Sequence, residues 1–267
     1  MCEHFCANSS IVAQNCCKFS KKAVQYTKEI IIFPYPPAST GFCRLRGHWR
    51  KRRAVADIFE LFRKISKKEE PVGKPDYILA GLGNPGGQYA ATRHNAGFMA
   101  VDRVCADLGT DCRRSRFSAL CGRAEIGGHS VLIMKPQTYM NLSGNAVRDA
   151  AQYYSIPVSH IIVISDDVNL DLGRMRIRSG GSDGGQKGLY DIIYKLSDDA
   201  FPRIRIGVGK KPEGYDMKDW VLSRFTKSDC ETMEPCLGAC ADAVRLIIEG
   251  KTDEAMGKYN GMRPHTD

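Results

Sequence analysis

The chain has no hydrophobic run long enough to cross a membrane. A transmembrane helix needs about 20 consecutive apolar residues, and the most apolar candidate, EIIIFPYPP at residues 29–37, ends in prolines. A secretory signal is also missing, because no apolar core follows a basic start. These absences predict a protein without a membrane partner, and we expect it in the cytoplasm.

Histidine is scarce, with six in 267 residues, and the eleven cysteines form no Cys-x-x-Cys pair. Structural zinc sites usually draw on such closely spaced ligands. We therefore expect no metal and no other cofactor. The cysteines of the main body are scattered, which is typical of buried thiols in a reducing compartment. They are Cys105, Cys112, Cys121, Cys230, Cys236 and Cys240.

The formal net charge of +9 is concentrated in the first fifth of the chain. Residues 1–53 hold ten Lys or Arg against two acidic residues, whereas the rest holds 29 basic and 28 acidic residues. Any nucleic-acid-binding surface beyond residue 53 must therefore be a local patch and not a general positive field.

Residues 1–54 show no sustained helical or strand periodicity, so we expect a disordered extension. Three explanations stay open: a targeting peptide, a basic nucleic-acid-binding tail, or translated upstream sequence. We favour the third, with translation starting at Val55. The intact mass of the protein made from its own locus would contradict this hypothesis if it included residues 1–54.

The pattern of residues 55–75 predicts an amphipathic helix followed by a linker. Its apolar side chains fall on one face, and EEPVGKP at residues 69–75 ends it. The face consists of Ile58, Phe59, Leu61, Phe62 and Ile65.

Beyond residue 76, strand patterns alternate with helical patterns, which is typical of an α/β fold with a parallel sheet. We predict one domain over residues 76–261, with a mixed, mainly parallel central sheet flanked by helices. The expected strands cover residues 77–82, 129–136, 160–167, 174–181 and 203–209. The expected helices cover residues 97–109, 138–154, 188–196 and 230–250.

The stretch ILAGLGNPGG, residues 78–87, has the spacing Gly-x-Gly-x-x-Gly after an expected strand. Dinucleotide-binding loops share this spacing, but there a helix starts inside the loop and an acidic residue ends a second strand about twenty residues on. Here Pro85 and Gly87 prolong the loop, and the following region is helical. A nicotinamide-dependent oxidoreductase is therefore the least favoured of the functions considered.

Three polar residues are expected at one edge of the sheet. Asn84 follows the first strand, Asp166 lies at the end of the strand over 160–167, and His94 lies in a loop. Open α/β sheets place their sites beyond the carboxyl ends of the strands. Each residue alone also fits an ordinary role, as turn former, helix cap or solvated strand end. Together they can form an Asp–His pair beside an amide.

Four blocks resemble, in order and spacing, the signature blocks of bacterial-type peptidyl-tRNA hydrolases. They are GLGNPGGQYAATRHNAGF, KPQTYMNLSGNAV, SDDVNLDLGRMRIRSGGSDGGQKGL and RIRIGVG, within a resemblance from about Tyr77 to Gly261. The resemblance implies an enzyme of translation that cleaves the ester between peptide and tRNA. It also implies a monomer that acts on peptidyl-tRNA without an obligate protein partner. The alternative is a non-catalytic RNA-binding protein on the same fold, similar to a splicing factor of chloroplasts.

The resemblance assigns roles to particular residues. His94 matches the general base of the family and Asp166 its carboxylate partner, which requires a hydrogen bond between them. Asn84 and Asn141 match amides that hold water and the peptide end. Substrate-binding positions of the family correspond to Tyr89, Tyr139, Met140 and Lys187.

Lys187 departs from the family pattern, because this chain has GGQKGL where GGHNGL is usual. The usual asparagine is thought to grip the substrate. Lysine donates hydrogen bonds but cannot accept one. We therefore expect retained activity with an altered grip on the peptide.

Arg176, Arg178 and Arg205 match basic positions with which the family holds tRNA phosphates. In an extended strand, Arg176 and Arg178 share one face, which suits a local phosphate-binding patch. An ordinary solvated strand face is the other interpretation of the same pattern.

Overall fold

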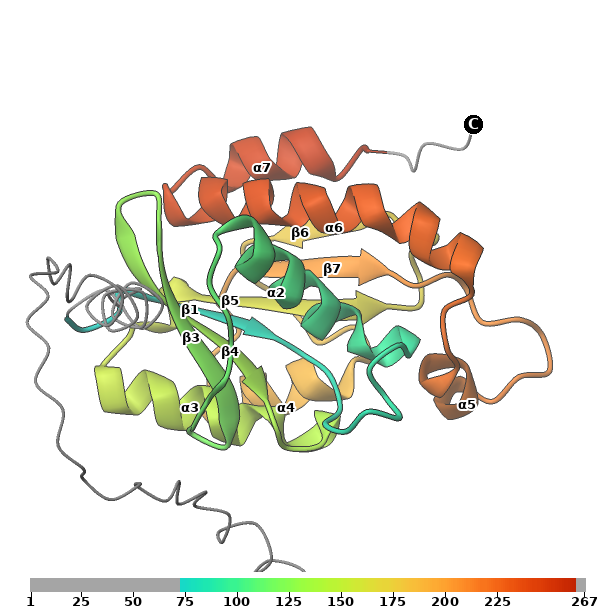
Figure 1. The fold of residues 1–267 in the computed structure, drawn as a ribbon, viewed down its shortest axis with the longest axis horizontal. Coiled ribbons are helices and arrows are strands. Elements are labelled where there is room, and N and C mark those ends of the chain that lie inside the picture. The colour runs from blue at the N-terminus through green and yellow to red at the C-terminus, as the bar shows by residue number, and fades with distance from the viewer. Residues whose placement is uncertain (1–72, 263–267) are drawn as a thin grey trace, which may run out of the picture. The chain divides into compact units, whose positions relative to one another are not determined.

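The computed structural model describes residues 73–262, and its centre is one seven-stranded sheet (Figure 1). The strands lie in the order β2-β3-β4-β1-β5-β7-β6. Their bounds are β1 Tyr77–Gly81, β2 Arg114–Arg116, β3 Ala119–Ile126, β4 His129–Pro136, β5 Ile161–Asp167, β6 Met175–Arg178 and β7 Arg203–Gly207. The extension predicted over residues 1–54, the helix predicted from residue 55 and the start-site hypothesis concern residues outside the described range.

The four central strands run parallel, so their carboxyl ends lie at one edge of the sheet. β1 pairs with β4 on one side and with β5 on the other, and β5 pairs with β7. The outer strands β2, β3 and β6 pair with their neighbours in antiparallel fashion. The predicted α/β fold with a mixed sheet and a parallel centre is therefore confirmed.

Helices cover both faces of this sheet (Figure 1). One face carries α2 (Ala96–Asp107), α6 (Lys227–Ile248) and α7 (Thr252–Tyr259), and the other carries α3 (Ser143–Tyr154) and α4 (Lys187–Leu196). α5 (Met217–Leu222) lies to one side. Within residues 73–262, no helix combines the length and the apolar character that crossing a bilayer requires.

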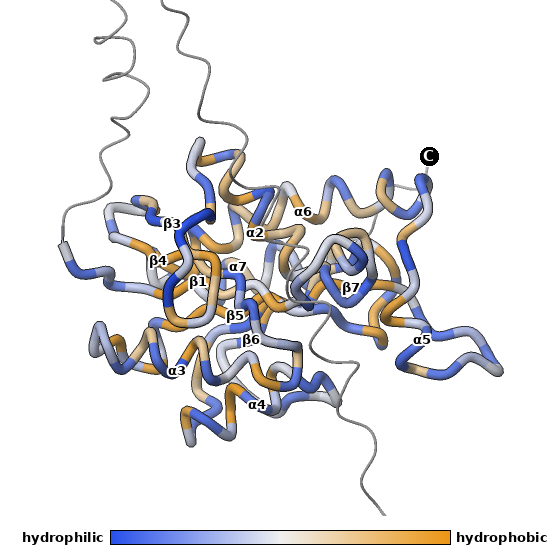
Figure 2. Tube along the Cα trace, turned by 60° about the horizontal axis from the view of Figure 1, so that its bottom comes forward, coloured by the Kyte–Doolittle hydropathy of each residue, from blue (hydrophilic) through white to orange (hydrophobic). Residues whose placement is uncertain are grey.

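Successive residues of the central strands supply two separate apolar clusters. Ile162 and Ile164 of β5 pack with the α2 and α6 side, whereas Ile161 and Val163 pack with the α3 and α4 side. This alternation follows from the two-residue period of a strand, and burial of both faces explains the continuous apolar run. Figure 2 shows the most hydrophobic stretches towards the centre and hydrophilic stretches in outer turns, including the loop before α5.

Two glycines allow α2 to begin directly against the sheet. A Cβ on Gly81 would overlap the carbonyl oxygen of Gly97, and a Cβ on Gly97 would overlap that of Ile164. A side chain at either position would push α2 away from β1 and β5. Because α2 begins only at Ala96, the glycine loop does not lead straight into a helix as a dinucleotide-binding loop does.

Some elements differ from the sequence-based prediction. β2, β3, α5 and α7 were not predicted. β3 shows why, because ALCGRAEI has small and charged residues in place of alternating β-branched ones. It is a strand because it pairs along its whole length with β4. The helix predicted from residue 138 begins at Ser143, after a 3₁₀ turn at Met140–Leu142. The last long helix begins early, at Lys227, where a capping box satisfies its first turn.

The expectation of buried thiols holds for five of the six cysteines in the described range, and Cys230 is exposed. Burial raises the pKa of Cys121 to about 11 and that of Cys236 to about 12. These thiols therefore stay protonated and unreactive at neutral pH.

Candidate active site

A pocket of about 1090 Å³ opens beyond the carboxyl ends of β1 and β5. All predicted site residues except Arg176 and Arg178 line it. They are Asn84, Tyr89, His94, Tyr139, Met140, Asn141, Asp166, Lys187 and Arg205. The loop after β1, the loops that precede α3 and α4, and α5 close its sides. Segments that are far apart in the sequence thus meet where an α/β sheet is expected to carry its site.

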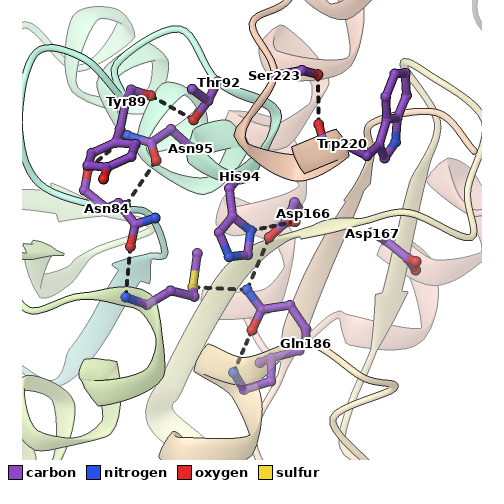
Figure 3. Close-up of polar contacts among 12 residues, drawn as sticks. Asn84, Tyr89, Thr92, His94, Asn95, Asp166, Asp167, Gln186, Trp220 and Ser223 are labelled. Atoms are coloured by element: carbon purple, nitrogen blue, oxygen red, sulfur yellow. Dashed lines mark hydrogen bonds and ion pairs between the residues drawn. The ribbon is translucent and has the colours of Figure 1, made fainter. Parts of the chain in front are cut away.

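The hydrogen bond that the predicted pair requires is present. His94 Nδ1 lies 2.8 Å from Asp166 Oδ2, with the imidazole coming from the turn Arg93–Asn95 just before α2 (Figure 3). Asp166 is 3% exposed and His94 14% exposed, so the carboxylate lies beneath an imidazole that reaches the pocket. Because an ionised carboxylate only accepts, the proton of a neutral imidazole belongs on Nδ1. Nε2 is then the atom that can accept a proton.

Gln186 is a polar member of the site that the sequence analysis missed. Its Nε2 donates to Asp166 Oδ1 over 3.0 Å, while His94 occupies the other carboxylate oxygen (Figure 3). Its Oε1 accepts from the backbone N–H of Leu189 and so caps α4. The position of Gln186 just before a predicted helix was a signal for the cap, but nothing in the sequence marked its contact with Asp166.

The amide of Asn84 is fixed in one orientation. Its Oδ1 accepts from the backbone N–H of Met140 at 2.9 Å, so Nδ2 is the group left to donate to a ligand. Asn95 holds the Asn84 backbone from both sides: its Oδ1 accepts from the Asn84 N–H, and its Nδ2 donates to the Asn84 carbonyl. Asn95 was also missed, since a polar residue before a helix looks like an ordinary cap.

The remaining pocket residues are less firmly held. Tyr139 is 59% exposed, and Asn141 and Lys187 are also exposed. Tyr89 is half-buried, whereas Met140 is buried beneath them. Lys187 is the first residue of α4, directly after Gln186, so its ammonium lies at the pocket rim.

Arg205 lies within the pocket wall and is already paired. Its Nε lies 3.0 Å from Asp167 Oδ2, and its Nη2 donates to the carbonyl of Gly184. Asp167 is 2% exposed, so the pair is largely removed from solvent. Asp167 therefore partly neutralises the charge of Arg205 before a phosphate binds.

Arg176 and Arg178 lie outside the pocket on the edge strand β6. Both are exposed while Met175 and Ile177 are buried, so the predicted shared face is present. Arg176 is the cross-strand partner of Arg205, and Arg178 is that of Arg203. The row of exposed arginines on β6 therefore starts directly beside Arg205, which lines the pocket.

Arg203 differs from its neighbours because it is buried. Its guanidinium donates to the carbonyls of Gly181, Ser182 and Asp199, which anchors the loop that leads to Gln186. Desolvation lowers its pKa from the ordinary value. Arg203 therefore holds in place the loop that carries Gln186.

Residues 73–262 contain no group of three or more His, Cys, Asp or Glu side chains able to hold a metal ion. A paired imidazole beside oriented amides can activate water next to a carbonyl group. Fold and pocket together define an α/β protein equipped for this kind of hydrolysis.

Comparison with known proteins agrees with this class. A family model described as peptidyl-tRNA hydrolase matches residues 78–266. The chain belongs to the peptidyl-tRNA hydrolase family, as the sequence resemblance predicted.

Similar proteins support the assignment along the full length of the domain. A peptidyl-tRNA hydrolase of Caldanaerobacter subterraneus subsp. tengcongensis is 45% identical over 185 residues, which are 69% of this chain and all of that protein. One of Moorella thermoacetica is 48% identical over 184 residues, covering 68% and 97% of the two chains. The crystal structure of peptidyl-tRNA hydrolase from Acinetobacter baumannii has a TM-score of 0.67 at 32% identity, covering 73% and 100%.

Proposed function

We propose that this protein hydrolyses peptidyl-tRNA at the ester between the C-terminal carbonyl of the peptide and the 3′-terminal ribose. The products are free peptide and reusable tRNA. Membership of the family supports this reaction. The observation that carries it is the 2.8 Å contact between His94 Nδ1 and Asp166 Oδ2, because it leaves Nε2 as a base in the pocket.

In the proposed reaction, His94 Nε2 takes a proton from a water molecule as the water oxygen attacks the ester carbonyl. Asp166 stabilises the imidazolium that forms. The Asn84 amide, fixed with Nδ2 free, is suited to donate to the developing oxyanion. Asn141 holds the water or the peptide end. The ribose oxygen then leaves and receives the proton from His94.

Substrate binding divides between the rim of the pocket and the strand beside it. Tyr89, Tyr139, Met140 and Lys187 line the pocket and contact the peptide or the tRNA terminus. Arg176 and Arg178 hold phosphates of the tRNA end. The ion pair of Arg205 with Asp167 gives Arg205 the smaller share of this task.

The enzyme acts as a cytoplasmic monomer without an obligate protein partner. All the residues assigned to the reaction come from a single chain and surround one pocket. Light scattering of the purified protein would contradict the monomer if it gave a mass twice that of the chain.

The test uses purified N-acetyl-aminoacyl-tRNA as substrate and follows release of the blocked amino acid. The wild type is expected to cleave it, and His94→Ala to lower kcat by about 10² to 10⁴, the usual contribution of a general base. Arg245→Ala, at an exposed position of α6 outside the pocket, is the matched control and should keep the wild-type kcat. A folded wild type that binds tRNA without cleaving it would contradict the proposal.

A non-catalytic RNA-binding role on this fold is not supported. The chain matches hydrolases over their whole length and retains a complete His94–Asp166 pair.

A further inference from the structure

The side chain of Gln186 makes two kinds of contact at once. It is 7% exposed and lies at the N-cap of α4. Its Oε1 accepts from the Leu189 N–H at 2.7 Å, and its Nε2 lies 3.0 Å from both Asp166 Oδ1 and Met140 Sδ. A helix cap and a partner of the Asp–His pair are therefore the same amide.

Only one orientation of this amide satisfies its neighbours. The Leu189 N–H can only donate, so it must face the oxygen of Gln186. The nitrogen then necessarily faces Asp166, which as a carboxylate accepts. The cap thus fixes the direction of the donor, and the donor fixes one oxygen of Asp166 while His94 meets the other.

We propose that Gln186 is a positioning residue for the hydrolysis, which holds Asp166 in the rotamer that faces His94. This inference rests on the proposed function. It links the first turn of α4 to an imidazole on the opposite face of the sheet, because Asp166 lies at the strand end and receives one partner from each side (Figure 3).

The backbone that carries Gln186 is itself held in place. Its N–H donates to the Asp183 carbonyl, and Arg203 binds the carbonyls of Gly181 and Ser182 at the start of the same loop. Gln186 therefore approaches Asp166 from an anchored loop. A residue placed this way can restrain a carboxylate.

A role as helix cap alone is the competing explanation, and the two can be separated by charge. Gln186→Glu keeps an oxygen for the Leu189 N–H but replaces the donor by a second carboxyl group beside Asp166. A carboxylate at a helix N-terminus is a good cap. Two adjacent carboxyl groups share a proton at low pH and gain a negative charge as the pH rises.

The other titratable or charged groups that face the pair stay unchanged in this variant. They are Lys187 of α4, the Asp167–Arg205 pair of β5 and β7, Asp216 and Lys218 at α5, and Tyr89 and Tyr139 in the remaining walls. The added carboxyl group is therefore the only new charge that reaches His94.

For Gln186→Glu we expect a melting temperature close to that of the wild type and an acid limb of kcat/KM that moves to higher pH. The added negative charge favours the imidazolium, so the base form of His94 appears at higher pH. A pH profile that superimposes on the wild type after scaling would overturn the inference. The NMR titration of the His94 imidazole reports the same displacement without substrate, so it tests the inference even if the wild type fails to cleave peptidyl-tRNA.

Gln186→Met removes donor and acceptor while keeping the shape. We expect kcat to fall about ten- to a hundredfold with KM changed less than about threefold, since a hydrogen bond to a charged group is lost. The matched control is Thr226→Val, which removes a side-chain cap from α6, a helix that contributes no residue to the pocket lining. The control should lose stability and keep kcat. Equal kcat in Gln186→Met and the wild type would also overturn the inference.

Discussion

Two polar regions of this protein are built in opposite ways. At the base of the pocket, Asn84, Asp166 and Gln186 are each less than 9% exposed and are held by hydrogen bonds of 2.7 to 3.0 Å. On the edge strand β6, Arg176 and Arg178 extend into solvent from alternate positions. The first region holds its polar atoms in fixed positions, and the second presents accessible positive charge.

The contrast indicates how the work divides. Stabilising a transition state requires donors and acceptors that do not reorganise, which buried and mutually satisfied groups provide. Attracting a polyanion requires accessible cations whose exact positions matter less. Changes at the base should therefore act on kcat, and changes on β6 should act on KM and on salt dependence.

The largest effect is expected from Asp166→Asn. Gln186 needs an acceptor, so the new amide must turn its oxygen toward Gln186 and its nitrogen toward His94. His94 Nδ1 must then accept, which moves the imidazole proton to Nε2 and removes the base. We expect kcat to fall by about 10² to 10⁴ with little change in KM. Steady-state kinetics measure both constants. A parallel rise in KM would contradict the expectation that changes at the base of the pocket act on kcat alone.

The double change Arg176→Ala and Arg178→Ala tests the other region. We expect KM to rise about three- to tenfold with kcat unchanged, and the slope of log KM against log salt to flatten by about 1 to 2. Arg245→Ala is the control, because Arg245 is exposed on α6, and this helix covers the opposite face of the sheet. Salt-insensitive binding of tRNA by the wild type would remove the phosphate patch from the account.

A third polar group, Arg93 beside His94, is buried and has a structural role. Arg93 Nη2 lies 2.8 Å from Asp229 Oδ2. Burial alone would raise the pKa of Asp229, but the backbone N–H of Thr226 and the Arg93 guanidinium bring it below its ordinary value of 3.8. The ionised carboxylate therefore stabilises the fold above that pH, and the contribution is lost as the pH falls through the lower folded-state pKa.

We expect Asp229→Asn to lower the free energy of unfolding by about 1 to 3 kcal/mol at pH 7. The difference from the wild type should shrink below about pH 4. Urea titrations at several pH values measure it. A difference that persists unchanged at pH 2 would show that charge is not its source.

The smallest effect is expected at Lys187, which lies at the exposed rim. Lys187→Asn should change KM about two- to threefold and leave kcat intact, since exposed charges contribute little. If KM also stays unchanged, the position is a neutral replacement.

The sequence alone was enough to predict the elements that follow from the periodicity of apolar and polar residues. Periodicity gave β1, β4, β5 and the alternating arginines of β6, and the strand ends indicated where Asn84, His94 and Asp166 meet. β3 could not be found this way, because its sequence lacks a strand pattern and its structure comes from pairing with β4.

The missed site residues depend on orientation instead. Gln186 matters because a cap directs its nitrogen at Asp166, and Asn95 because two loops approach closely enough for it to hold the Asn84 backbone. The pairing of Arg205 with Asp167 is of the same kind. Such contacts join residues eleven or more positions apart through the way the loops fold, so a single sequence carries no local signal for them.

The most direct test of the division is the affinity of deacylated tRNA for the wild type, for Asp166→Asn and for the Arg176→Ala, Arg178→Ala double variant under one salt condition. We expect Asp166→Asn to bind tRNA as tightly as the wild type while its turnover collapses, and the arginine variant to bind more weakly. Equal loss of tRNA affinity in both variants would contradict the division of work between the base of the pocket and β6.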